Sequence, residues 1–267
     1  MFDGVRFVDT PLVQIEGGSI VAVGNDVRLG GPVADLGDVT LMPGIVDCHQ
    51  HLVFDGNGTL QEQVADLTDE QLAERAWQLA RTALIGGITT VRDLGDRNFV
   101  TLPLRGDPDL PTLLCAGPPI TPVGGHCWFL GGEVADADGL AAAVQARADH
   151  GCDVVKIMVT GGFGTPAMPA WKSQFGADDI VMVTELAHAA GLPVAAHCHG
   201  EEGIRHDVDA GGDTIEHCSV MNEPFAPDPD PPLREDLANS GNALSAAIGR
   251  CADPPPPPAV LVRAAPM

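Results

Sequence analysis

The chain has 267 residues, of which 45% are apolar and 19% are charged, a composition typical of a folded globular protein and not of a disordered one. The formal net charge is −23, from 37 acidic and 14 basic residues, so the surface repels nucleic acids and anionic membranes. We therefore expect neither as a partner. The acidity says little about the substrate, and a homo-oligomer is left open.

The N-terminal residues MFDGVRFVDTPL lack a basic segment followed by an apolar one, which argues against a signal peptide. No apolar run approaches the roughly 20 residues that span a bilayer. The 7 cysteines show no CxxC spacing, and this pattern without an export signal predicts reduced thiols in a cytoplasmic protein.

Residues 1–42 consist of short β-rich pieces separated by turn residues. Within them, Gly17-Gly18 predicts a hairpin turn between two strands with alternating apolar side chains. A segment of this size cannot contain a core of its own, so we expect it to pair with another part of the protein. The resulting prediction is a small N-terminal domain that ends near residue 42.

From residue 43 onward, apolar strand patterns alternate with helical ones, which predicts a buried parallel sheet in an α/β fold. The first helical pattern, residues 67–87, begins with Thr68 at a capping position and ends at Gly86-Gly87. Three further helical patterns, residues 137–151, 177–191 and 204–212, also end in glycine. Seven strand candidates occupy residues 44–51, 88–94, 112–117, 153–159, 193–199, 214–219 and 243–249.

An eighth strand is missing from this pattern. Residues 251–267 include a run of prolines, which excludes a helix interior or a central strand and predicts a Pro-rich tail. Because a (β/α)₈ TIM-type barrel needs eight strands, we expect residues 43–250 to form an incomplete barrel of about seven. Its first and last strands would have unpaired edges, so the chain made alone is predicted to be poorly soluble or inactive.

The local motif with the clearest chemistry is His49-Gln50-His51, which follows an apolar strand pattern. Alternate side chains of a strand share a face, so His49 and His51 point the same way and two neutral imidazoles can bind one metal ion. Ordinary polar residues at a strand end would give the same pattern, so this motif alone leaves both interpretations open.

A lysine and two more histidines occupy comparable positions late in other strands. Lys156 lies in the otherwise uncharged strand VVKIMV, where it either reaches solvent or has an unusual environment or modification. His197 and His217 each lie late in a predicted strand, and parallel barrels collect their active sites at the C-terminal ends of strands. By contrast, His150, His188 and His206 fall on helical patterns and are interpreted as surface or packing residues.

As a set, PGIVDCHQH, VVKIMVTGG, PVAAHCHGEEGI and GGDTIEHCS resemble the amidohydrolase superfamily, and within it the imidazolonepropionase-like and Xaa-Pro/Xaa-Arg dipeptidase branch. The resemblance extends from the N-terminus to about residue 250. It implies a small β-sandwich beside the barrel, to which residues 1–42 would contribute.

The resemblance also implies a binuclear metal site and a role for each of its residues. His49 and His51 would bind one divalent cation, and His197 and His217 a second. Lys156 would bridge both after reaction with carbon dioxide to a carbamate. Zn²⁺ suits these ligands best, with Mn²⁺, Fe²⁺ and Co²⁺ as alternatives. His217 and Lys156 are thereby predicted to be catalytic as well as metal-binding.

Further residues are expected to face the substrate. His199 shares a face with His197, and His126 lies in the Gly-rich segment PVGGHCWFLGG. By resemblance, both would contact a substrate carboxylate or carbonyl, with plain loop histidines as the alternative. Thr160 and Gly161 are predicted to line the same cavity.

The implied reaction is hydrolysis of an amide-type C–N bond, in a dipeptide or an N-acyl amino acid, by a metal-activated hydroxide. In the family, an aspartate on the eighth strand shuttles the proton, and this sequence shows no equivalent. Asp93 is in the wrong place, and alternation along the strand predicts that Glu216 faces away from the site. Two alternatives therefore remain, an inactive remnant that binds metal or a partner chain, and a deaminase or cyclic-amide hydrolase.

Overall fold

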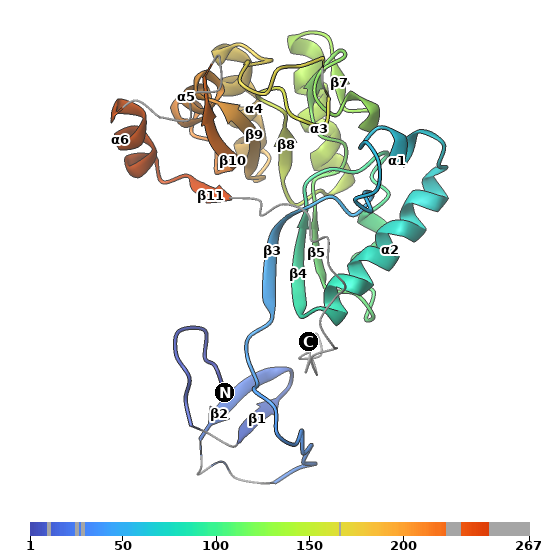
Figure 1. The fold of residues 1–267 in the computed structure, drawn as a ribbon, viewed down its shortest axis with the longest axis vertical. Helices are drawn as coiled ribbons and strands as arrows, with labels where there is room; N and C mark the ends of the chain where they lie inside the picture. Colours follow the sequence, from blue (N-terminus) through green and yellow to red (C-terminus); the bar gives the residue numbers. More distant parts are fainter. Residues whose placement is uncertain (10–11, 25–26, 28–29, 166, 223–230, 246–267) are drawn as a thin grey trace.

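The computed structural model describes residues 1–9, 12–24, 27, 30–165, 167–222 and 231–245 (Figure 1). The predicted Pro-rich tail, residues 251–267, lies outside these residues, as does the second half of the last predicted strand. Within the described part of the chain, no helix is both long and apolar enough to cross a membrane.

The N-terminal segment forms a two-stranded antiparallel hairpin, as predicted. Strands β1 (Val13–Glu16) and β2 (Ser19–Val23) are joined by a tight turn, in which Gly17 and Gly18 both adopt positive φ angles of 54° and 79°. The hairpin lies at one end of the molecule beyond β3, and its apolar side chains, such as Ile20, remain exposed (Figure 1). It has no core of its own, but the division of domains at residue 42 stays a prediction.

All seven predicted parallel strands are present. Strands β3, β4 and β5 form one sheet, and β8, β9, β10 and β11 form another. The two sheets lie next to each other, because the Asp153 amide before β8 donates to the Cys115 carbonyl of β5 at 2.9 Å. Ile120, which follows β5, also forms a parallel bridge with Ile157 of β8. The strands comprise β3 (Ile45–Gln50), β4 (Ile88–Asp93), β5 (Thr112–Cys115), β8 (Val155–Ile157), β9 (Val194–Gly200), β10 (Thr214–Met221) and β11 (Ala243–Ser245).

This series does not close into a cylinder. Among the described residues, β3 and β11 are each hydrogen-bonded to a strand on one side only. Their apolar side chains are accordingly exposed, with Ile45, Val46 and Leu244 at 48%, 58% and 55%. The prediction of an α/β fold with an incomplete barrel is confirmed.

The helices lie outside the strands, and four of them correspond to the predicted helical patterns. Helix α2 (Asp69–Ile85) starts with a capping box, in which the Thr68 hydroxyl accepts from the Gln71 amide and the Gln71 side chain accepts from the Thr68 amide. Its buried residues recur every four positions and face β4 and β5 (Figure 1). The others are α1 (Glu62–Ala65), α3 (Ala137–His150), α4 (Ala177–Ala189), α5 (Glu201–Ala210) and α6 (Pro231–Ser240). Helices α2 to α5 are the predicted ones, although α5 begins at Glu201, before the predicted residue 204. The sequence patterns did not predict α1 and α6.

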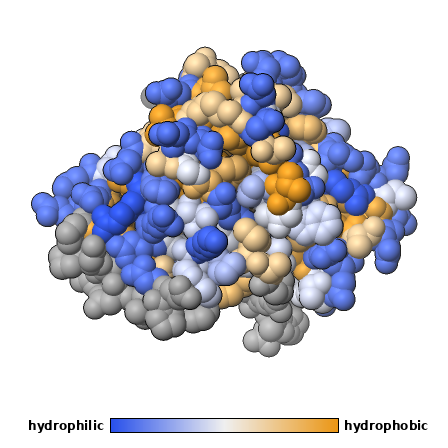
Figure 2. All heavy atoms as spheres, turned by 90° about the horizontal axis from the view of Figure 1, so that it is seen from above, coloured by the Kyte–Doolittle hydropathy of each residue, from blue (hydrophilic) through white to orange (hydrophobic). Residues whose placement is uncertain are grey.

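Strand β9 runs through the main core of the protein. All seven of its residues are buried, and it packs with β8 against α4 through side chains such as Val155, Val183 and Val194. This explains its nearly continuous apolar sequence, which is typical of a parallel strand covered on both faces. From above, hydrophilic side chains cover much of the surface, interrupted by apolar groups (Figure 2). The site described below is therefore anchored to the most rigidly packed part of the sheet.

Candidate metal centre

The predicted ligand histidines come together at the C-terminal ends of β3, β9 and β10. The ring centroid of His217 lies 4.7 Å from that of His197 and 4.8 Å from that of His49. The His51 centroid lies 5.4 Å from that of His49. Four imidazoles from three strands and the loop after β3 thus form one cluster.

His199, which was predicted to face the substrate, belongs to the same cluster. Its ring stacks on His217 at 4.7 Å, and one ring nitrogen from each of His197, His199 and His217 lies within 4.8 Å of the others. Such separations suit ligands that share one metal ion. His199, predicted as a substrate contact, is therefore placed together with the predicted ligands His197 and His217 in one group that could hold an ion.

Hydrogen bonds determine which ring nitrogen of each histidine is left free. Carbonyl and carboxylate oxygens only accept, so the nitrogen that contacts one must carry the proton. His51 donates through Nδ1 to the Gly95 carbonyl at 3.0 Å, and His197 donates through Nε2 to the Gly161 carbonyl at 3.0 Å. His51 is left with Nε2 as its basic nitrogen and His197 with Nδ1.

Lys156 lies at the base of this cluster and is 1% exposed. Its Nζ has no hydrogen-bond partner among the described residues, which is costly for an ammonium group. Burial lowers the pKa of Lys156 to about 8, so a substantial fraction of the amine is neutral near physiological pH. The structure therefore rejects the interpretation of Lys156 as a solvent-facing side chain.

The same burial keeps the histidines neutral. Burial, together with nearby positive charge, lowers the pKa of His51 to about 3 and that of His199 to about 4. The pKa of His49 and that of His197 are lowered for the same reasons. Neutral imidazole is the form that binds a metal ion, so the donor set fits a divalent cation.

Glu216 is the residue that sequence reasoning placed incorrectly. It is fully buried and points to the same side as His217, because His217 and Cys218 have positive φ angles of 69° and 45° that break the alternation of the strand. Its carboxylate accepts a hydrogen bond from His49 Nδ1 at 2.7 Å and from Arg92 Nη2 at 2.8 Å. Burial raises the pKa of Glu216, but the His49 hydrogen bond and the Lys156 charge outweigh this effect and bring it to about 2.

The predicted substrate-facing residues lie beside the cluster. The His126 ring is 4.5 Å from that of His197, and the Thr160 hydroxyl accepts from the His199 amide at 2.9 Å. Thr160 and Gly161 thus support the β9 histidines directly. Their contact with a substrate, and that of His126, stays a prediction.

Asp93 supports the loop that carries His51. Its Oδ1 accepts from the Leu52 amide at 3.1 Å. Burial and the neighbouring Asp96 raise the pKa of Asp93 to about 7. That Asp93 has no role in proton transfer stays a prediction.

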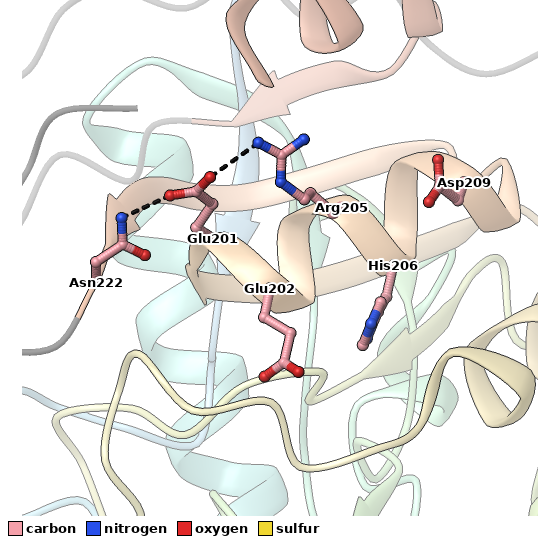
Figure 3. Close-up of a pocket in the computed structure, with 6 residues that line it drawn as sticks. All are labelled: Glu201, Glu202, Arg205, His206, Asp209 and Asn222. Carbon is pink, nitrogen blue, oxygen red and sulfur yellow. Dashed lines mark hydrogen bonds and ion pairs between the residues drawn. The ribbon is translucent and has the colours of Figure 1, made fainter. Parts of the chain in front are cut away.

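A separate open cavity of about 550 Å³ lies over α5 (Figure 3). Glu201 is held there by Arg205 at 2.9 Å and by Asn222 at 2.6 Å. His206, which was predicted on a helix, also lines it. None of the clustered histidines lines this cavity, so it is distinct from the candidate metal centre.

The parallel strands are those of an incomplete α/β barrel, and the histidine cluster at their C-terminal ends is a donor set that fits a divalent cation. A sequence model of the amidohydrolase family matches residues 40–226, and the chain therefore belongs to the amidohydrolase family. This confirms the resemblance drawn from the four sequence motifs.

Individual relatives agree with this assignment. Ochratoxinase from Aspergillus niger is 26% identical over 213 residues, covering 68% of this chain and 44% of the relative. An imidazolonepropionase from Agrobacterium fabrum is 28% identical over 123 residues, covering 43% of this chain and 27% of the relative. A Xaa-Pro dipeptidase with bound methionine in its active site has a similar structure, with a TM-score of 0.72 and 26% identity over 87% of this chain and 60% of that one. The chain spans less than half the length of the ochratoxinase and of the imidazolonepropionase.

Proposed function

We propose that the protein is a metal-dependent hydrolase that cleaves an amide-type C–N bond. The observation that carries the proposal is the buried amine of Lys156, which has no partner among the described residues and lies among neutral histidines. An ammonium group is unstable in such a place, whereas an anionic lysine derivative between two cations would be stabilised.

In this proposal His49 and His51 would hold one divalent cation, His197 and His217 would hold a second, and carbamylated Lys156 would bridge them. To form the carbamate, the neutral Lys156 amine would attack carbon dioxide, so that a C–N bond forms, one C=O π bond opens and one proton leaves the nitrogen to solvent. The carbamate would carry a single negative charge shared by two oxygens. Zn²⁺ is the favoured cation, because imidazole and oxygen ligands suit it.

When bound, the cations would lower the pKa of a water molecule, so that hydroxide is available to attack a carbonyl near neutral pH, and would polarise that carbonyl. The chain's own residues bind and orient the substrate. His199 and His126 present imidazoles beside the cluster, and aromatic rings flank it, with Phe163 5.1 Å from His199 and Phe54 5.5 Å from His51. These rings would exclude water from an apolar part of the substrate.

A dipeptide or an N-acyl amino acid is the proposed substrate class. The similarity to a Xaa-Pro dipeptidase over most of the chain supports it. A cyclic amide is the second candidate, because imidazolonepropionases are also among the relatives, although over shorter segments.

A metal-binding chain without turnover is the alternative from a different class. Glu216 is already bonded to His49 and Arg92, so it is not free to transfer a proton between water and a leaving nitrogen. The open edges of β3 and β11 favour the same alternative.

Elemental analysis of monodisperse protein, combined with hydrolysis of a dipeptide panel, tests the proposal. We expect about two metals per chain, and the variant His217→Asn should lose metal and turnover together. His188→Asn is the matched control, because His188 lies on α4 and contacts Asp213 instead of the cluster. Metal without turnover would select the non-catalytic alternative, and no stoichiometric metal would refute both.

A further inference from the structure

We propose that Glu216 is a positioning residue that fixes the proton of His49 on Nδ1 and so directs the basic Nε2 of His49 at the metal centre. This inference rests on the proposed function for its consequence in metal binding. The tautomer that it assigns to His49 is independent of that function and can be measured without metal.

The geometry around the Glu216 carboxylate is asymmetric. One oxygen, Oε2, accepts from His49 Nδ1 at 2.7 Å. The other, Oε1, accepts from Arg92 Nη2 at 2.8 Å and from the Thr214 hydroxyl at 2.9 Å. Arg92 and Thr214 therefore hold one oxygen in place, and the other oxygen accepts from the imidazole. The Ser245 side chain adds a further hydrogen bond to this carboxylate.

The position of His49 explains why such a tether is needed. His49 lies on β3, which among the described residues has a neighbouring strand on one side only. Glu216 reaches it from β10, which belongs to the other sheet. Arg92 strengthens the tether, since its Nε donates to the Cys48 carbonyl at 2.7 Å while its Nη2 holds Glu216.

The substitution Glu216→Gln keeps the shape of the side chain but replaces one of the two hydrogen-bond-accepting oxygens with an NH₂ group, which donates. Arg92 and Thr214 both donate, so they retain the amide oxygen of the glutamine on their side. The amide NH₂ is then directed at His49 Nδ1, which must accept, and the proton moves to His49 Nε2. The nitrogen that should face the metal is thereby blocked.

Long-range ¹H–¹⁵N spectra of the metal-free full-length chain measure the tautomer. We expect His49 to be protonated at Nδ1 in the wild type and at Nε2 in Glu216→Gln, with His49→Gln used to assign the signals. His51 is an internal reference, because its Nδ1 donates to a backbone carbonyl and should be unchanged. Titration with Zn²⁺ should show affinity about 10–100-fold weaker in Glu216→Gln.

One control separates positioning from general destabilisation. Asp207→Asn changes another buried carboxyl group, which lies on α5 outside the histidine cluster. This variant should keep the wild-type His49 tautomer and bind Zn²⁺ within about twofold of the wild type. If His49 of the wild type is protonated at Nε2, the proposal is overturned, whether or not Glu216→Gln folds. If Glu216→Gln folds and its His49 tautomer is unchanged, the proposal is also overturned. Wild-type protein that binds no Zn²⁺ but has the assigned tautomer refutes the proposed function and leaves the positioning intact.

Discussion

Two histidine pairs with the same spacing lie on strands that are packed differently. His197 and His199 belong to β9, where every residue is buried and strands are bonded on both sides. His49 and His51 come at the end of β3, whose first residues, Ile45 and Val46, are about half exposed and which, among the described residues, has one unpaired edge.

The difference shows in how each pair is held. The β9 pair is fixed by the segment that follows β8, through the Gly161 carbonyl and the Thr160 hydroxyl. The β3 pair depends on the Glu216 side chain and on the Gly95 carbonyl. We infer that the β9 half of the site is preformed by packing, whereas the β3 half depends on a few specific contacts and on the metal.

Of the variants considered, Lys156→Met should have the largest effect on metal binding and turnover, because Lys156 is the proposed bridge between the β3 half and the β9 half of the site. We expect loss of stoichiometric metal and a fall in turnover of at least about 10²–10³-fold, the loss that accompanies removal of one strong electrostatic contribution to catalysis. Elemental analysis and initial rates measure both. The control is Lys172→Met, since Lys172 is the other lysine of the chain and its side chain is exposed.

The same variant should gain stability in the absence of metal. The pKa of Lys156 falls from 10.5 in the unfolded chain to about 8 in the folded one. The burial of Lys156 therefore costs no stability above pH 10.5, and its cost grows as the pH falls towards 8. At neutral pH the cost is roughly 3 kcal/mol, which methionine would not incur. Denaturant unfolding in the presence of a chelator measures it, and equal stability of variant and wild type across this pH range would contradict the assigned burial of the ammonium.

Much of this arrangement was predictable from local signals. Strands with near-continuous apolar sequence gave the parallel sheet, and Thr68 and the terminal glycines marked the helix ends. Lys156 was identifiable because a lone charge in an apolar strand needs an explanation. These signals are short in range, so they can be interpreted without the tertiary structure.

Glu216 was not predictable in the same way. Alternation along a strand placed it opposite His217, and the positive φ at His217 that reverses this placement leaves no mark in the residue types. Its partners Arg92 and His49 lie more than a hundred residues away in the sequence. Contacts across the barrel interior depend on the curvature of the strand series, which the sequence pattern does not specify in detail.

Metal binding should sharpen the contrast between the two strands in hydrogen exchange. Without metal, we expect β3 amides to exchange faster than β9 amides, because an edge strand opens locally at lower free energy. A metal concentration about 100 times the dissociation constant stabilises the folded, metal-bound protein by about 2.7 kcal/mol. Amides that exchange only through openings that release the metal should then exchange roughly 100-fold more slowly. Mass-spectrometric exchange on peptides that contain β3 and β9 measures this change, and equal protection of both strands by metal would contradict the inferred difference.

A smaller and more local effect is expected from Gly95→Ala. A Cβ at Gly95 would lie 2.9 Å from Cε1 and Nδ1 of the His51 ring, so that ring must move and weaken its hydrogen bond to the Gly95 carbonyl. We expect about tenfold weaker metal binding. Gly162→Ala is the matched comparison, because its Cβ would meet the His126 ring, and His126 is not among the proposed ligands.

Gly162→Ala should therefore leave metal affinity unchanged and raise the KM for a dipeptide. Metal titration and steady-state kinetics on both variants test this separation. If Gly162→Ala weakened metal binding as much as Gly95→Ala, His126 would share in holding the ion, and the β9 side would be as dependent on loop contacts as the β3 side. If Gly95→Ala had no effect, the His51 ring would adapt freely, and the dependence of the edge strand on the Gly95 carbonyl would be refuted.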